Sequence, residues 1–478
     1  MALNRREFLG SLAVGVPSAV IARQRDTRRS RRAIVIGAGL AGLAAALRLH
    51  EAGWDVAMLE ARARPGGRVH TLREPFSDGL YADAGAARIQ DTHEYTLSYV
   101  KRFDLVLDPF WPGEGRSVMW VGGRRILSPP RTPVDLAQVP FDFTAEERRM
   151  GLRDGYVRYL FSHLDALGDV TSPAWPPAGL DRFEVPIAEF CRQNGASPAF
   201  IRMVAFGHDL TGMSALQFLR DAALGMKTRQ WFKIRGGNDR LPAALAAALS
   251  DRIRYGAPVV RVEQDAAAVR VTYLRDTTPV TIDGEYVVCA VPAAVMDRVE
   301  VRPELTPLKR EALRELGSLA MARVYLQANR RFWIERGESG WGGTDDPMDI
   351  WDYTRDQPGR RGILGAYLSG RIAETVTALD ADRRGPWIRE RMEHVHPGIT
   401  EHYETSASYS WIDDPWARGA GVEFHPGQLT RYGRVLRAPE GRIHFAGEYT
   451  SAWSSWMNGA LESGERAAAE ITARASSA

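Results

Sequence analysis

Three glycines spaced for phosphate binding lie near the start of the chain, in the sequence AIVIGAGLAGLAAAL. Gly37 permits a tight turn, Gly39 lets the backbone approach a phosphate closely, and Gly42 lets a helix pack against the preceding strand. The free N–H groups at the start of that helix would hold a pyrophosphate. The pattern therefore predicts dinucleotide binding, with Leu40 and Ala41 at the helix start among the contacts.

A strand, a helix and a second strand must position these glycines. Residues 33–36 read as a buried strand, and residues 40–50 as a helix of good helix formers without proline. A second strand over residues 55–59 ends in Glu60, where a carboxylate would bind the ribose hydroxyls. The alternative is a glycine turn that arose by chance. Because a helix, a second strand and Glu60 follow the turn at the spacing of a dinucleotide-binding unit, we expect a Rossmann-like unit.

Length and charge narrow the class of protein. The chain has 478 residues, 45% of them hydrophobic, enough for two or three domains. Its net charge is +3, but residues 1–32 carry eight Arg against Glu7 and Asp26, a net charge of +6, so the remainder is −3. Nucleic acid is therefore not expected as a partner. Cys191 and Cys289 form no CxxC pair, so no metal site is expected, and a disulfide between them stays open.

Residues 1–32 are predicted to be an export signal and basic junction rather than part of the fold. Arg5 and Arg6 precede an apolar run of fifteen residues from Phe8 to Ala22, which is too short to span a bilayer. Paired arginines before a short apolar region resemble a twin-arginine signal. We expect the twin-arginine machinery as a partner, a periplasmic or secreted protein, and no stable membrane span. A frayed N-terminal helix is the alternative.

Three further segments extend the nucleotide motif. The sequence ARARPGGRVHT follows Glu60, and its Arg68 offers a fork of donors. Residues 441–468 read GRIHFAGEYTSAWSSWMNGALESGERAA, and APVVRV lies between the two. Together these segments resemble the flavin amine oxidase family, whose pattern is GxGxxG, then Glu-Ala-Arg, then Gly-Gly-Arg. An NAD-dependent Rossmann enzyme is the weaker alternative.

The resemblance implies FAD as the cofactor. Val259 would hold the adenine through its backbone, Glu448 would bind the ribityl chain, and the segment from Ser455 to Ala460 would line the flavin. The position of the family's covalent-flavin cysteine aligns with Gly419, so the FAD should be noncovalent. The cofactor-binding residues expected from motif and resemblance are Gly37, Gly39, Leu40, Ala41, Gly42, Glu60, Ala61, Arg62, Gly67, Arg68, Gly85, Ala86, Ala87, Arg88, Val259, Glu448, Ser455, Trp456, Met457 and Ala460.

The family's architecture implies an α/β fold (α+β overall): a Rossmann-like FAD-binding domain, a discontinuous mixed-sheet substrate domain and a helical insertion. The expected boundaries are 33–85, 236–300 and 425–478 for the FAD-binding domain, 86–115 and 301–424 for the substrate domain, and 116–235 for the helical domain.

Within the family the chain most resembles the L-amino acid oxidases. The segment DAGAARIQDTHEYTLSYVKRFDLVL resembles the one that carries the arginine for the substrate carboxylate, which places that role on Arg88. A guanidinium grips a carboxylate bidentately and would fix the substrate's Cα over the flavin. The alternative is that Arg88 pairs with an acid across a domain seam.

Aromatic and small residues would shape the substrate site. Trp456 falls at the family's aromatic wall in front of the flavin, next to Ser455. The second wall aligns with Ala420, which is small, as in amino acid oxidases rather than monoamine oxidases.

Three departures from the family pattern leave roles open. The lysine that commonly holds a water near flavin N5 aligns with Arg323, or with Met321 under a different anchor, and an arginine cannot relay a proton. A histidine near the substrate aligns with Asp221. A carboxylate-binding tyrosine falls among Trp351, Asp352 and Tyr353. If Asp221 and Asp352 face the pocket they favour a basic side chain, whereas surface positions are the alternative for either.

The resemblance predicts an exported oxidase of the Cα–N bond of an L-amino acid, with Arg88, Arg323 and Trp456 as its catalytic residues. The product imine would hydrolyse to a 2-oxo acid and ammonia, and O2 would be reduced to hydrogen peroxide. Alternatives are a monoamine or polyamine oxidase, a flavin dehydrogenase with another electron acceptor, a monooxygenase, and a flavin-bound binding protein without turnover. The side chain accepted and the oligomeric state, a homodimer included, stay open.

Overall fold

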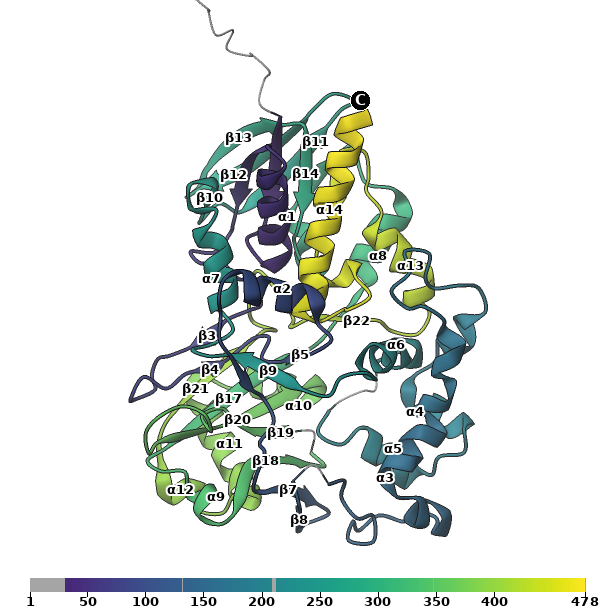
Figure 1. Cartoon of the computed structure of the whole chain (residues 1–478), viewed down its shortest axis with the longest axis vertical. Helices are drawn as coiled ribbons and strands as arrows, with labels where there is room; N and C mark the ends of the chain where they lie inside the picture. The colour runs from purple at the N-terminus through teal and green to yellow at the C-terminus, as the bar shows by residue number, and fades with distance from the viewer. Residues whose placement is uncertain (1–30, 131, 209–211, 347, 478) are drawn as a thin grey trace, which may run out of the picture.

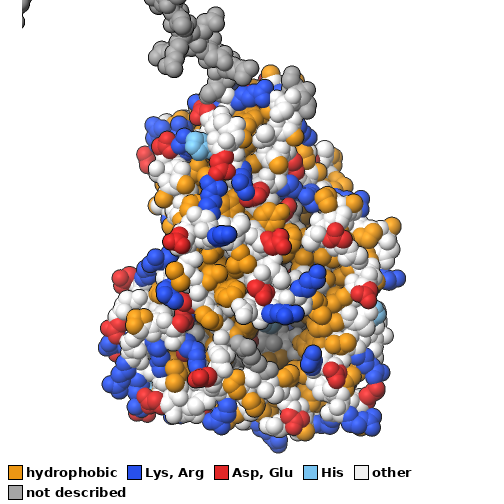
Figure 2. All heavy atoms as spheres, viewed as in Figure 1, with side chains coloured by type: hydrophobic (Ala, Val, Ile, Leu, Met, Phe, Trp, Pro, Cys, Tyr) orange, Lys and Arg blue, Asp and Glu red, His pale blue; other side chains and the backbone are white. Residues whose placement is uncertain are grey.

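The computed structural model describes residues 31–477, apart from residues 131, 209–211 and 347. Figure 1 shows one lobe that carries the first and last helices, a second lobe built on a larger sheet, and a group of helices beside that sheet. The predicted export motif at Arg5 and Arg6 lies outside the described residues. Figure 2 shows charges of both signs interspersed over the visible face.

A five-stranded parallel sheet forms the core of the first lobe, with strand order β10-β2-β1-β14-β23. The helices α1 (Leu40–Glu51) and α14 (Met457–Ser477) pack side by side on it, as Figure 1 shows. Gly464 permits their close approach, since a Cβ there would lie 2.1 Å from the Ala41 carbonyl oxygen. The predicted strand, helix and second strand are confirmed to within one residue. The five strands are β1 (Arg32–Ile36), β2 (Asp55–Leu59), β10 (Ile253–Arg254), β14 (Tyr286–Cys289) and β23 (Ile443–Phe445).

A four-stranded sheet of order β13-β12-β11-β15 accompanies the parallel sheet. Its strands are β11 (Val259–Gln264), β12 (Val269–Arg275), β13 (Thr278–Gly284) and β15 (Glu300–Arg302). The helices in and beside this lobe are α2 (Glu94–Arg102), α7 (Arg240–Ala247), α8 (Pro307–Glu315) and α13 (Gln428–Arg437).

The second lobe is built on a mixed seven-stranded sheet of order β21-β17-β20-β19-β18-β7-β8, in which only β18 and β7 pair in parallel. Its central strands are buried on both faces because helices cover one face and the other lies against the first lobe's loops. The strands are β7 (Arg116–Val121), β8 (Arg124–Ser128), β17 (Met321–Ala328), β18 (Glu338–Thr344), β19 (Met348–Asp352), β20 (Gly362–Ser369) and β21 (Tyr403–Ser410). The helices are α9 (Phe332–Glu335), α10 (Gly370–Thr377), α11 (Ala381–Val395) and α12 (Ile399–His402).

The expected helical domain, 116–235, is wrong at both ends. Residues 116–128 form a hairpin at the edge of the seven-stranded sheet, turned by Gly122 and Gly123 with φ of +55° and +75°. Two such residues give a turn that matches the twist of paired strands. At the other end of the range, β9 (Trp231–Ile234) pairs with β5 (Ile89–Gln90) and β6 (Leu107–Pro109). Residues 231–234 therefore belong to a three-stranded sheet and not to a helix.

The helical segment proper contains α3 (Ala145–Tyr159), α4 (Ile187–Gln193), α5 (Pro198–Val204), α6 (Ala215–Gly225) and the 3-10 helices Phe161–Leu167 and Leu180–Phe183. Thr144 and Glu147 form a capping box that fixes the start of α3. Short strand pairs join β3 (Thr71–Leu72) to β4 (Ala82–Asp83) and β16 (Gly317–Ser318) to β22 (Val422–Glu423). None of the helices within the described ranges has the length and apolar content to cross a bilayer.

Candidate active site

A cavity of about 360 Å³ runs from the glycine turn to the seven-stranded sheet. Every cofactor-binding residue expected from the sequence lines it except Gly42. Gly42 lies beneath the turn, where a Cβ would meet the Gly37 carbonyl oxygen at 1.9 Å. Segments far apart in the chain therefore converge on one elongated site.

The phosphate end of the cavity depends on backbone that has no room for side chains. Gly37 has φ +100°, a conformation that L side chains rarely adopt. Gly39 precedes α1, and a Cβ there would meet no atom within 4 Å, so the space above the helix start is open. The described geometry fits a pyrophosphate at the start of α1.

Glu60 is held ready for a ribose. Its two carboxylate oxygens accept hydrogen bonds from the backbone N–H groups of Ala38 (2.6 Å) and Arg62 (2.8 Å). Burial raises its pKa, although these two hydrogen bonds act in the opposite direction. Each oxygen keeps a lone pair for a hydroxyl donor.

Two arginines that follow Glu60 pair with acids from the later part of the chain. Arg62 forms a bidentate pair with Asp414 at 2.6 and 2.8 Å. Arg68 donates to Glu448 at 2.8 Å, and the other oxygen of Glu448 accepts from the Ser455 N–H at 2.7 Å. These contacts join the two predicted flavin segments directly, and both segments line the same cavity.

Arg88 brings a buried cation to the cavity wall. Its guanidinium carbon lies 5.6, 5.2 and 5.7 Å from the ring centres of Trp231, Trp351 and Trp456. Among the described residues no acceptor hydrogen-bonds to it and no carboxylate lies within ion-pairing distance. Burial lowers its pKa, opposed by Tyr367 and Asp349, but an arginine remains protonated. The alternative prediction, an ion pair across a domain seam, is not found among the described residues.

Arg323 on β17 contributes a second cation. It donates to the Asp83 carbonyl oxygen at 2.5 Å and to the Tyr353 hydroxyl at 3.1 Å, while its buried Nε has no partner. Burial lowers its pKa, but the surrounding tyrosines, led by Tyr353, outweigh burial and raise it. Met321 lines the same cavity two residues away, so both candidates for the family's lysine position share one strand face, and only Arg323 brings a charge.

The three candidates for the carboxylate-binding tyrosine do not line the main cavity. Trp351 lies under Arg88, and Tyr353 holds Arg323. Asp352 is on the opposite strand face, where it accepts from the Trp333 indole (3.0 Å) and from Thr354, so its predicted place in the substrate site is wrong. Strand alternation explains this: neighbouring side chains of β19 point to opposite faces of the sheet.

Tyr367 on β20 is the tyrosine that the sequence did not identify. It pairs directly with Arg323 in the sheet register, lines the cavity, and its hydroxyl has no hydrogen-bond partner among the described residues. Its strand, GILGAYLS, is buried throughout and has no alternating pattern. Only its register with β17 could have located it.

The helical segment closes one side of the cavity with Met213, Gln217 and Asp221. Asp221 faces the cavity as predicted, and its Oδ1 accepts from Arg220 at 3.1 and 3.3 Å. Ala420 also lines the cavity, and its small side chain leaves room there.

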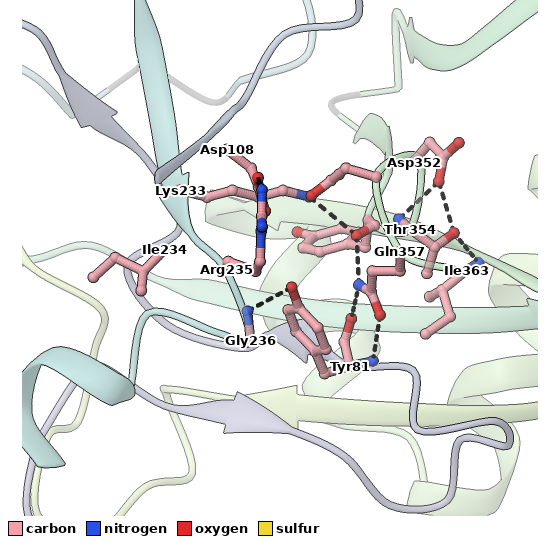
Figure 3. A network of polar contacts seen from close by, with 12 residues as sticks. Tyr81, Asp108, Lys233, Ile234, Arg235, Gly236, Asp352, Thr354, Gln357 and Ile363 are labelled. Atoms are coloured by element: carbon pink, nitrogen blue, oxygen red, sulfur yellow. Dashed lines mark hydrogen bonds and ion pairs between the residues drawn. The ribbon is translucent and has the colours of Figure 1, made fainter. Parts of the chain in front are cut away.

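A polar network supports the wall behind Arg88 (Figure 3). Lys233 on β9 donates to the Tyr353 carbonyl oxygen at 3.3 Å and pairs with Asp356 at 2.7 Å. Gln357 donates to the carbonyl oxygens of Tyr81 and Tyr353 at 2.8 and 2.9 Å. These bonds join β9, which carries Trp231, to the connection that follows β19, which carries Trp351. They therefore fix two of the three tryptophan rings that surround Arg88.

Comparison with known proteins decides the family. The profile of flavin containing amine oxidoreductases matches residues 40–472. The chain belongs to this family. FAD is therefore its cofactor, and the cradle from Gly37 to Trp456 has the donors and open space to hold it. The resemblance to the flavin amine oxidases and the expected fold class are both confirmed.

Similar proteins include oxidases with different substrates. The chain is 28% identical over 468 residues to YobN of Bacillus subtilis (strain 168), covering 93% of this chain and 95% of that protein. It is 28% identical over 465 residues to the L-amino-acid oxidase BmooLAAO-I of Bothrops moojeni, covering 93% and 90%. Among solved structures, cyclohexylamine oxidase from Brevibacterium oxydans IH-35A matches with a TM-score of 0.81 and 23% identity, covering 94% and 100%. Putrescine oxidase bound to putrescine matches with a TM-score of 0.79 and 24% identity, covering 93% and 99%.

Proposed function

We propose that this flavin amine oxidase acts on the Cα–N bond of an L-amino acid. The observation that carries the proposal is Arg88, a guanidinium without a hydrogen-bonding partner among the described residues, held in the cofactor cavity by three tryptophan rings. A cation removed from water and left unpaired is costly, so the site is arranged for an anionic group. A substrate α-carboxylate supplies that group.

The residues around Arg88 have distinct tasks in this proposal. Arg88 grips the carboxylate with two parallel N–H donors, and the free Tyr367 hydroxyl adds a third donor. Trp456 limits where the substrate's Cα can lie, and Ala420 leaves room beside it. The amine must be neutral before oxidation, because its lone pair forms the imine bond.

The redox step belongs to the cofactor: when bound, FAD accepts the hydride that leaves Cα and returns the electrons to O2, which yields hydrogen peroxide. The imine is hydrolysed to a 2-oxo acid and ammonia. Arg323 keeps a fixed positive charge at the cavity wall, because an arginine does not release its proton in this pH range. No side chain is required as a base for Cα.

The deciding experiment uses matched pairs of substrates. Purified holoprotein is mixed with one compound at a time in the absence of oxygen, and the loss of flavin colour is recorded. L-lysine is compared with cadaverine, and L-ornithine with putrescine. We expect the amino acids to bleach the flavin and the decarboxylated amines not to. Bleaching by the amines alone would assign the chain to the amine or polyamine oxidases instead.

We also propose export by the twin-arginine route. Arg5 and Arg6 before a short apolar run support it. That route carries folded proteins, which suits an enzyme that must load its cofactor first.

A further inference from the structure

A row of aromatic rings leads from the cavity to the protein surface. Tyr367 lines the cavity and stacks on Trp351, with ring centres 4.8 Å apart. Trp351 stacks on Trp341 at 5.7 Å, and Trp341 contacts Trp111 at 4.6 Å. Trp111 is 38% exposed. Each ring therefore touches the next, from the flavin site to solvent.

A second row reaches the same surface residue. Trp456 lines the cavity and lies 5.7 Å from Trp231, ring centre to ring centre. Trp231 lies 6.2 Å from Trp111. Two separate series of contacts thus start at different cavity walls and meet at Trp111.

The cations of the site are distributed unevenly along these rows. Arg88 lies by Trp231, Trp351 and Trp456, and Arg323 lies 5.4 Å from the ring centre of Trp351. Arg323 is also 4.9 Å from the ring centre of Tyr367. Across the described residues, no arginine or lysine is positioned over the ring of Trp111.

This distribution gives electron loss a direction. Removing an electron from a ring beside a guanidinium creates a second positive charge within a few ångströms, which Coulomb repulsion disfavours in a poorly solvated site. Loss from Trp111 meets no such repulsion, and water stabilises the charge. The inner rings are therefore harder to oxidise than Trp111.

We propose that the two rows carry one-electron oxidising equivalents away from the flavin site to Trp111. An oxidant at the flavin takes an electron from a cavity ring, and electrons then move inward from ring to ring until Trp111 is one electron short. The Trp111 indole gives its N–H proton to bulk water, and superoxide, formed when FAD passes the electron to O2, adds with a proton to the carbon radical to give a hydroperoxide. Light-excited FAD is the probe oxidant, and it passes the electron to O2.

This activity would protect the cavity, because reactive oxygen species arise where O2 is reduced. Damage would fall on one exposed side chain rather than on Trp456 or Tyr367. The inference requires FAD in the cavity but no amino acid, so it is tested independently of the proposed substrate.

The test illuminates holoprotein with blue light in air, without substrate, and locates oxidised tryptophan by peptide mass spectrometry. We expect Trp111 to carry most of the oxidation. The double variant Trp231→Phe and Trp341→Phe keeps an aromatic ring at both positions, but phenyl rings are much harder to oxidise than indoles. It should lose most oxidation at Trp111 and gain it at Trp456. Equal oxidation of Trp111 in parent and double variant would overturn the proposal.

Two controls separate relay from exposure. Hydroxyl radicals generated in bulk water should oxidise Trp111 equally in parent and double variant, and this result measures whether its exposure is the same in both. Trp387→Phe, on α11 and off both rows, should leave the light-driven pattern as in the parent. If the double variant does not bind FAD, the single variants Trp231→Phe and Trp341→Phe are compared, and each should lower oxidation of Trp111. No decrease in either would contradict the proposal.

Discussion

Arg323 and Tyr367 occupy directly paired positions of β17 and β20, and both side chains line the cofactor cavity. The Arg323 guanidinium carbon lies 4.9 Å from the Tyr367 ring centre. One polar wall of the site is therefore built by a single rung of the seven-stranded sheet. Among the described residues the Tyr367 hydroxyl has no hydrogen-bond partner, so the proposed substrate-binding roles of Tyr367 and Arg88 are testable.

Arg88→Ala should cost roughly 2–4 kcal/mol in transition-state stabilisation, the range for breaking a buried charge-assisted pair. That is about 30- to 1000-fold in kcat/KM. The loss should fall on amino-carboxylates and not on the amines that lack a carboxylate. Arg88→Lys should recover little, because a point charge does not reproduce the fork. Equal losses for both substrate classes would make Arg88 structural.

Tyr367→Phe should raise KM for amino acids about 10- to 160-fold, as expected for one lost hydrogen bond to a charged group at about 1.36 kcal/mol per tenfold change. The turnover number should change less. Tyr353→Phe is the matched control, because that hydroxyl contacts Arg323 rather than open cavity. A larger rise of KM in Tyr353→Phe than in Tyr367→Phe would reverse the assignment.

Glu60→Ala should weaken FAD binding, because the ribose loses its acceptor at the end of β2. Titration of apoprotein with FAD measures the effect, and Glu263→Ala on β11 serves as a surface control.

Acid precipitation of the parent should release all FAD into the supernatant, since no cysteine is among the described residues that line the cavity. Flavin retained in the pellet would contradict noncovalent binding.

Replacing Arg5→Lys and Arg6→Lys together should leave folded, yellow protein in the cytoplasm. The parent should reach the periplasm or medium. Cell fractionation with flavin fluorescence compares the two. Export of the doubly substituted chain by the same cells would remove the twin-arginine proposal.

Asp83 predicts a pH dependence of stability. Burial raises its pKa from 3.8 to about 6, opposed by the Thr71 hydroxyl and the Asn238 N–H. The folded state therefore binds more protons than the unfolded state between these values, and stability falls as pH rises from about 4 to about 6. The loss is on the order of 3 kcal/mol at most.

Asp83→Asn should remove that part of the decline, measured as the free energy of unfolding in urea at pH 4 and pH 7. Asp283→Asn, on the exposed β12–β13 hairpin, should keep the parent's profile. An identical decline in the Asp83 variant would show that other groups cause it.

The cofactor contacts could be predicted because they are encoded locally. Gly37, Gly39 and Glu60 belong to one strand–helix–strand unit, and the motif fixes both their spacing and their environment. Arg88 follows within the same region of the chain. The resemblance to the flavin amine oxidases supplied the distant contacts of Glu448 and Trp456.

The substrate wall could not be predicted in the same way. Trp231 and Tyr367 reach the site only through strand pairings across long stretches of chain. β20 is buried along its whole length, so its sequence does not reveal which residue pairs with Arg323. Asp352 was misplaced for the same reason, since one step along β19 reverses the face. The Gly122-Gly123 pair indicates a hairpin over 116–128, even though the sequence that follows it is helical.

The helical segment meets the cavity through Met213, Gln217 and Asp221, while the carboxylate and cofactor contacts come from other parts of the fold. If Met213, Gln217 and Asp221 contact the substrate side chain, part of the substrate range is set by a segment separate from Arg88 and the glycine turn. We expect mutations at these positions to change which side chains are accepted more than they change FAD binding. This separation offers a practical route to engineered specificity, in which libraries confined to three positions leave cofactor loading intact.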